Sequence, residues 1–179
     1  MQKVLLTISL ISLVLLSFQG IKLSKGAKKK MDKAIIGAWQ TEFALKELSI
    51  NGGISKELNL TGDEVLYAVR EMDNSLLGYA VLTHAKGRYD LFDLLIVYNP
   101  ELDIQKTQVL VYREDWGGEI ASARWLKQFV GMDASSKIQL SHDVQGISGA
   151  TISCQSATQE IKRVTVLVNR LKEKGALSI

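Results

Sequence analysis

The stretch EVLYAVREMDNSLLGYAVLTH, residues 64–84, decides the fold class of this chain. Its two runs of β-branched and aromatic residues are separated by DNS at 73–75, a segment typical of a tight turn between paired strands. Two further strand-like runs follow, LFDLLIVYN at 91–99 and IQKTQVLVYRE at 104–114, and Pro100 lies between them. Successive strands joined by turns, without alternating helices, predict a largely antiparallel sheet.

Helical patterns flank these strands. Asp32 is a candidate N-cap for DKAIIGAWQTEFALKELSI (32–50), where apolar spacings predict one amphipathic helix, and NGG at 51–53 predicts a turn. After the strands, residues 113–131 predict a loop and a short helical unit, and the apolar stripe of residues 156–174 predicts a long helix. The sequence therefore predicts an α+β fold, a largely antiparallel sheet with flanking helices, in a single domain over residues 32–175.

The N-terminal residues 1–20, MQKVLLTISLISLVLLSFQG, have the pattern of a signal peptide, with a lysine before an almost uncharged run at 4–18. That run is shorter than the ~20 apolar residues that span a bilayer, so a permanent anchor is the second interpretation. We interpret the Lys-rich residues 21–31 as a solvated tether rather than a membrane or nucleic-acid contact. These features predict an exported protein, in the periplasm or on the outer face of the cytoplasmic membrane.

Charge and cysteine content exclude several classes of function. Residues 1–33 contain seven Lys and one Asp, which leaves 15 basic and 18 acidic residues in the remainder, a net charge of −3. We therefore expect no nucleic-acid partner. Cys154 is the only cysteine, and His84 and His142 lie far apart, so we expect neither a disulfide nor a metal site. We interpret Cys154 as a packing residue, with a redox role as the alternative.

Two acidic residues in strand-like sequence, Asp90 and Asp93, have no His or Ser partner at a suggestive spacing. We predict them to be turn or outer-face residues. The sequence also contains none of the short motifs of the commonest hydrolases or nucleotide triphosphatases.

The segment that indicates chemistry is Ser148-Gly149-Ala150-Thr151, followed by Ser153, at the start of the last predicted helix. Amide N–H groups in the first turn of a helix have no intrahelical acceptor, and the helix dipole is positive there, so the turn can bind a phosphate. The glycine and the alanine leave room for a ligand. A second interpretation is that Ser148 and Thr151 are ordinary N-capping residues.

The surrounding segment HDVQGISGATISCQSA (142–157) resembles the flavinylation site of the FMN-binding domain family. This family includes subunits of Rnf-type and sodium-pumping NADH:quinone oxidoreductase complexes and free-standing exported electron carriers. Its members have an acidic residue before an S/T-G-A-T stretch, whose final Thr is linked to FMN by a flavin transferase. Asp143 and Thr151 match these two positions, and Ser153 matches a hydroxyl that commonly follows. The similar Ser-Ala-Thr at 156–158 lies inside the predicted helix, where terminal amides are absent.

The segment YREDWGGEIA (112–121) is similar to the family's E-T-P-G-L-G loop. Glu114 and Gly117 match that loop, whereas Asp115, Trp116 and Gly118 depart from it. We therefore predict that Trp116 stacks on the flavin ring.

The resemblance implies an exported electron carrier with FMN covalently bound through its phosphate to Thr151, rather than an independent oxidoreductase. Its partners would be a flavin transferase and membrane or extracytoplasmic redox proteins. One alternative is a flavin-free exported binding or scaffold module that uses the same turn for an anion. Another is a reductase with its own substrate, which would need a proton donor beside the flavin; the sequence indicates none.

Overall fold

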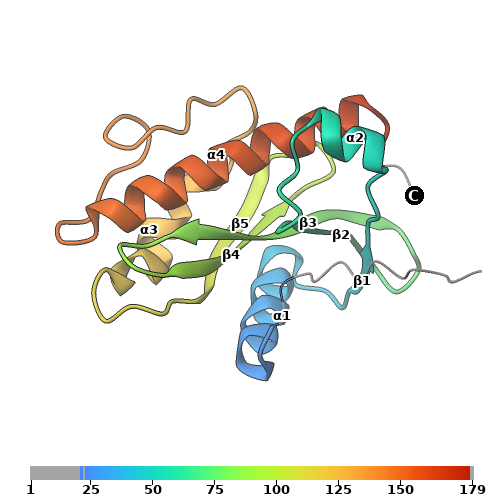
Figure 1. Cartoon of the computed structure of the whole chain (residues 1–179). Coiled ribbons are helices and arrows are strands. Elements are labelled where there is room, and N and C mark those ends of the chain that lie inside the picture. Colours follow the sequence, from blue (N-terminus) through green and yellow to red (C-terminus); the bar gives the residue numbers. More distant parts are fainter. Residues whose placement is uncertain (1–20, 22, 178–179) are drawn as a thin grey trace, which may run out of the picture.

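The computed structural model describes residue 21 and residues 23–177, and the predicted signal peptide at 1–20 lies outside these residues. A five-stranded open sheet forms the centre of the molecule (Figure 1). Its strands follow one another in chain order, and all neighbours are antiparallel. They are β1 (Ala44–Glu47), β2 (Val65–Arg70), β3 (Leu76–Lys86), β4 (Leu91–Tyr98) and β5 (Ile104–Val111). The predicted α+β fold is confirmed.

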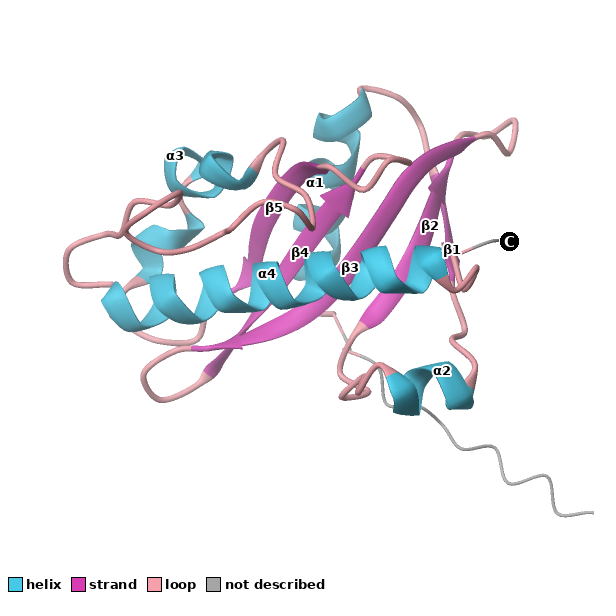
Figure 2. Cartoon of the chain, turned by 90° about the horizontal axis from the view of Figure 1, so that it is seen from above, coloured by secondary structure: helices cyan, strands magenta, loops and turns pink. Residues whose placement is uncertain are grey.

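The two long helices cover opposite faces of the sheet, as Figures 1 and 2 show. They are α1 (Lys25–Trp39) and α4 (Thr151–Glu173). Shorter helices lie in the connections: α2 (Gly52–Glu57), η1 (Gly118–Ala121), α3 (Ala123–Leu126) and η2 (Lys127–Phe129). Within the described residues, no helix combines the length and the apolar character needed to span a bilayer.

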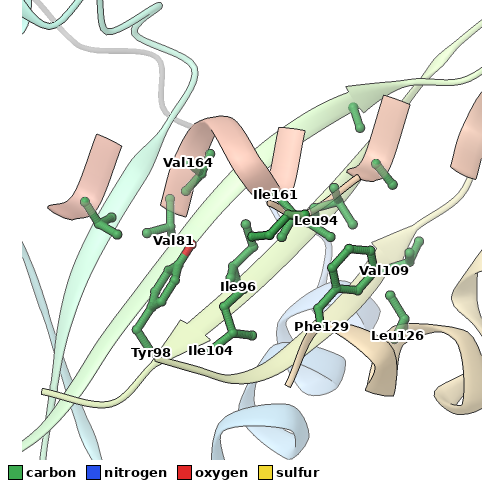
Figure 3. Close-up of a cluster of buried hydrophobic side chains, with 14 of the residues drawn as sticks. Val81, Leu94, Ile96, Tyr98, Ile104, Val109, Leu126, Phe129, Ile161 and Val164 are labelled. Carbon is green, nitrogen blue, oxygen red and sulfur yellow. The ribbon is translucent and has the colours of Figure 1, made fainter. Parts of the chain in front are cut away.

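Strand β4 is buried on both of its faces because a helix covers each side of the sheet. Phe92, Leu94 and Ile96 point into the core beneath α4, whereas Leu95 and Val97 pack in the core beneath α1. Figure 3 shows the α4 side of this core. Its labelled residues are Val81, Leu94, Ile96, Tyr98, Ile104, Val109, Leu126, Phe129, Ile161 and Val164.

Polar contacts fix the position of α4 along the sheet. Arg163 donates to Glu64 Oε1 at 2.6 Å, and the Glu64 side chain is fully buried at the start of β2. Nearer the start of α4, Ser156 Oγ accepts from the backbone N–H of Lys86 at 2.7 Å. These contacts place the first turn of α4 beside the turn between β3 and β4.

The helix predicted over residues 32–50 is wrong at both ends. Helix α1 begins at Lys25, because Ser24 Oγ accepts from the Ala27 N–H at 3.2 Å and caps it. It ends at Trp39, since Gln40 adopts a left-handed conformation with φ 55°. The lysines from Lys25 onward are therefore helical rather than part of a tether. The predicted turn at 51–53 is also wrong, because the Asn51 side chain caps α2.

Candidate functional site: a cleft at the start of α4

A cleft of about 620 Å³ opens at the N-terminus of α4. Three segments form its walls: the turn between β3 and β4, the loop that follows β5, and the first turn of α4. The lining residues are Arg88, Tyr89, Asp90, Arg113, Glu114, Asp115, Trp116, Gly117, Gly149, Ala150, Thr151, Ile152 and Ser153.

The first turn of α4 presents unpaired backbone donors to this cleft. Ala150 is the N-cap residue and makes no side-chain capping bond, so the N-cap interpretation of Ser148 and Thr151 is wrong. Among the described residues, the N–H groups of Thr151, Ile152 and Ser153 have no acceptor. Gly149 has φ 83°, and a Cβ there would meet open space. The turn therefore has donors that could bind an anion such as a phosphate.

Tyr112, at the end of β5, connects two of the three walls. Its hydroxyl donates to the Trp116 carbonyl at 2.8 Å and lies 2.9 Å from Ser153 Oγ. Because the single tyrosine proton is used on Trp116, Ser153 donates to Tyr112. The Ser153 hydroxyl is buried and engaged, and it joins the first turn of α4 to the loop after β5.

Glu114 fixes the turn between β3 and β4, which is the wall that Tyr112 does not contact. Its Oε1 accepts from the backbone N–H groups of Asp90 at 2.8 Å and Tyr89 at 2.7 Å. These backbone hydrogen bonds, that of Asp90 first, lower the pKa of the Glu114 carboxyl below its ordinary value. The ionised carboxylate thus fixes the turn between β3 and β4 against the loop.

Arg113 is anchored to the sheet by Asp93. Its two terminal nitrogens donate to the two Asp93 oxygens, each at 2.8 Å, and this pairing raises the pKa of Arg113. His84 Nδ1 lies 2.9 Å from Asp93 Oδ1. The Asp93 side chain is only 4% exposed, so the prediction that it lies on an outer face is wrong. Its partners come from neighbouring strands, which explains why no local spacing revealed them.

Exposed aromatic and aliphatic side chains line the cleft. Trp116 is 82% exposed, Tyr89 73% and Ile152 53%. The Arg88 guanidinium lies 5.2 Å from the centre of the Tyr89 ring, and no carboxylate among the described residues pairs with it. The cleft therefore combines anion-binding amides and a free cation with a flat apolar surface. This combination suits a ligand that has a phosphate and an aromatic ring.

The cleft includes most, but not all, of the residues expected from the sequence. Glu114, Trp116, Gly117, Gly149, Ala150, Thr151 and Ser153 line it. Ser148 and Asp143 do not; Asp143 is exposed, and its carboxylate accepts from the Gln139 N–H at 3.2 Å within a separate turn. Four further lining residues were not expected from the sequence: Arg88, Tyr89, Asp90 and Arg113. The only local signal was a KGRYD turn between two predicted strands, at 86–90.

Two nearby nucleophiles are unsuited to covalent chemistry. Cys154 is fully buried, and desolvation raises the pKa of its thiol, as expected of a packing residue. Thr158 is 1% exposed and donates to the Cys154 carbonyl at 2.7 Å. Over the part of the chain that the structure describes, no group of three or more His, Cys, Asp or Glu residues could hold a metal ion.

The family model described as an FMN-binding domain matches residues 64–166, more than half of the chain. No curated protein matches the chain. The matched region runs from the start of β2 into α4 and contains every residue that lines the cleft.

Proposed function

The chain belongs to the FMN-binding domain family and binds FMN, and from this premise we propose an exported electron carrier with FMN esterified through its phosphate to Thr151. The observation that supports the linkage most strongly is the state of Thr151 itself. Its side chain is exposed in the cleft, and within the described residues its hydroxyl has no hydrogen-bond partner. It belongs to the same helical turn as the free amides of Ile152 and Ser153.

The residues of the cleft fit the phosphate and the ring of FMN separately. The amides of the first turn of α4 would hold the phosphate oxygens. The exposed rings of Trp116 and Tyr89 would hold the isoalloxazine, and Arg88, at the Tyr89 ring, would supply positive charge. Bound FMN supplies the redox chemistry, while the protein fixes the ring and leaves an edge of it open to partners.

Attachment to Thr151 exchanges its O–H bond for an O–P bond. A flavin transferase brings an activated flavin phosphate donor, whose leaving group departs with the hydroxyl proton. The chain therefore gains the mass of FMN less one water. The exposure of Thr151 supports this step, because the transferase must reach the hydroxyl before the ring binds in the cleft.

A volume of about 620 Å³ lies within the range of sites for one small molecule, and we propose that FMN occupies the cleft. Redox partners then exchange electrons at the exposed edge of the ring. We propose that these partners are membrane or extracytoplasmic redox proteins, in keeping with the signal-like pattern of residues 1–20.

Denaturing electrophoresis after coexpression with a flavin transferase tests the linkage. We expect a band of the chain that fluoresces under ultraviolet light, and we expect Thr151→Ala to abolish this fluorescence. Because Thr151 caps nothing, that substitution should change the free energy of unfolding by less than about 0.5 kcal/mol.

Thr158→Ala is the matched control, since it removes a hydroxyl from the similar Ser-Ala-Thr sequence one to two turns further along α4. It should keep the fluorescent band, although it costs about 1 kcal/mol through its lost hydrogen bond. A band that is lost in Thr158→Ala but kept in Thr151→Ala would contradict the assignment.

A further inference from the structure

The solvent face of α1 has a row of lysines that the flavin site does not use. Lys25, Lys28, Lys29 and Lys33 are exposed on this face, which we call the α1 lysine face. The opposite face of the helix packs on the sheet through Ala27, Met31, Ala34 and Ile35. Lys30 does not belong to the lysine face, because its ammonium donates to the Leu110 carbonyl at 3.1 Å.

Interactions within the helix do not explain this row. Lys25 and Lys28 lie in the first turn of α1, at the positive end of the helix dipole, and that turn has no acidic residue. Lys25 and Lys29, and again Lys29 and Lys33, are like charges four residues apart, a spacing that destabilises a helix. Among the residues that the structure describes, Lys28 alone of the four has a carboxylate partner, Asp32 at 3.0 Å. Most of the positive charge of this row is therefore not neutralised by carboxylates of the described residues.

We propose that the α1 lysine face binds the anionic headgroups of phospholipids at a membrane surface. Clustered lysines next to a membrane-directed segment are attracted to anionic lipid. Here the apolar run at 4–18 ends seven residues before Lys25 in the chain. The residues after 33 have a net charge of −3, so the rest of the molecule is repelled from the same surface. The opposite charges of α1 and of the rest of the molecule favour one orientation, with α1 toward the lipid.

The orientation leaves the flavin cleft accessible. Helix α1 lies on one face of the sheet, and α4, whose first turn forms a wall of the cleft, lies on the other (Figure 1). Binding through α1 thus holds the protein at the membrane without covering the cleft.

Lysine labelling of the full chain tests the proposal. The chain is mixed with vesicles of phosphatidylcholine alone or with added phosphatidylglycerol, treated with an amine-acetylating reagent, and analysed by peptide mass spectrometry. We expect the labelling of the α1 lysine face to fall several-fold only with phosphatidylglycerol, and to recover in high salt because screening weakens the attraction. Labelling of the exposed Lys46 and Lys137 should not change.

A matched pair of variants distinguishes the effect of the α1 lysine face from the effect of total positive charge. Replacing Lys25, Lys28, Lys29 and Lys33 by Gln should lower partitioning into phosphatidylglycerol vesicles on the order of 1,000-fold. The control variant replaces Lys46, Lys56, Lys127 and Lys137, which are exposed elsewhere, and should partition nearly as the wild type does. Equal labelling with both vesicle types, or protection by duplex DNA but not by vesicles, would overturn the proposal. Neither readout depends on FMN.

Discussion

Three consecutive residues directly after β5 each make a different contact that shapes the cleft. Tyr112 binds Ser153 of α4 and the Trp116 carbonyl, Arg113 binds Asp93, and Glu114 binds the turn between β3 and β4. A short segment thereby sets the distances among all three walls. These contacts preform the cleft. Replacing any one of the residues that make them should therefore change its geometry.

Gly117 also shapes the cleft, because it has φ 84° and a Cβ there would lie 2.7 Å from the Tyr112 hydroxyl oxygen. We expect Gly117→Ala to destabilise the protein by about 2 kcal/mol and to weaken flavin retention. Gly118→Ala is the control, since its Cβ would meet Tyr112 at an ordinary 3.6 Å. Urea unfolding measures both variants, and equal stabilities would contradict the assigned role of Gly117.

Trp116 offers the largest unpartnered aromatic surface in the cleft. If it stacks on the flavin ring, Trp116→Leu should raise flavin fluorescence and shift its absorbance, because a stacked aromatic contact worth about 0.5–1.5 kcal/mol is lost. Trp116→Phe should restore most of the wild-type spectrum. An unaltered absorbance and redox potential in Trp116→Leu would show that Trp116 does not stack on the flavin ring.

At the scale of elements, the turn between β3 and β4 should be sensitive to pH through Glu114. The pKa of this carboxyl lies below its ordinary value of 4.5 in the folded protein. Its contribution to stability is therefore fully present above pH 4.5 and is lost as the pH falls through the lowered pKa. Amide hydrogen exchange at Tyr89 and Asp90 should accelerate over that window, relative to the intrinsic rates.

Glu114→Gln keeps the acceptor oxygen but removes the charge, so its exchange rates should not change in the same window. Glu119→Gln, in the neighbouring η1, serves as the control and should behave as the wild type does. Identical pH profiles for wild type and Glu114→Gln would show that the carboxylate does not fix the turn.

Elements with local signals were predictable from the sequence. Strands β2 to β5 have β-rich runs bounded by turns, and α4 has a continuous apolar stripe. The start of α1 was missed because Ser24, its cap, precedes lysines that indicate a solvated segment. Strand β1 was missed because it is a short edge strand, mostly exposed, whose four residues pair with β2 only in the folded sheet.

The same distinction applies to the site. The Ser148–Thr151 turn was recognisable because its residues are contiguous and open a helix. Arg88, Tyr89 and Asp90 reach the cleft only through the β3–β4 hairpin and the contact with Glu114, which lies 24 residues from Asp90 in sequence. Asp93 is buried because Arg113 and His84, from other parts of the sheet, meet it there. Such pairings depend on strand register, which a single sequence does not specify.

At the scale of the whole molecule, the family match covers fewer residues than the folded unit does. The match covers residues 64–166, but α1 and β1 lie before it. Helix α1 covers one face of the sheet, where Val69, Ala80, Leu82, Leu95, Val97 and Leu110 are buried. The region that matches the FMN-binding domain therefore does not include the helix that covers one face of its sheet.

A chain of residues 64–179 should therefore fail to fold cooperatively. Each large apolar side chain that loses its cover costs about 1.5–3 kcal/mol, and several such losses approach the whole stability of a typical domain. Near-ultraviolet circular dichroism and urea unfolding check this, with a chain of residues 21–179 as the folded control. A cooperative transition in the shorter chain would show that α1 is dispensable.

The central claim is the phosphoester between FMN and Thr151. Its most direct test is mass spectrometry of the protein recovered from its native host, on the intact chain and then on its proteolytic peptides. We predict an added mass equal to FMN less one water, located on the peptide that contains Thr151. An unmodified chain, or the same added mass on a different residue, would contradict the claim.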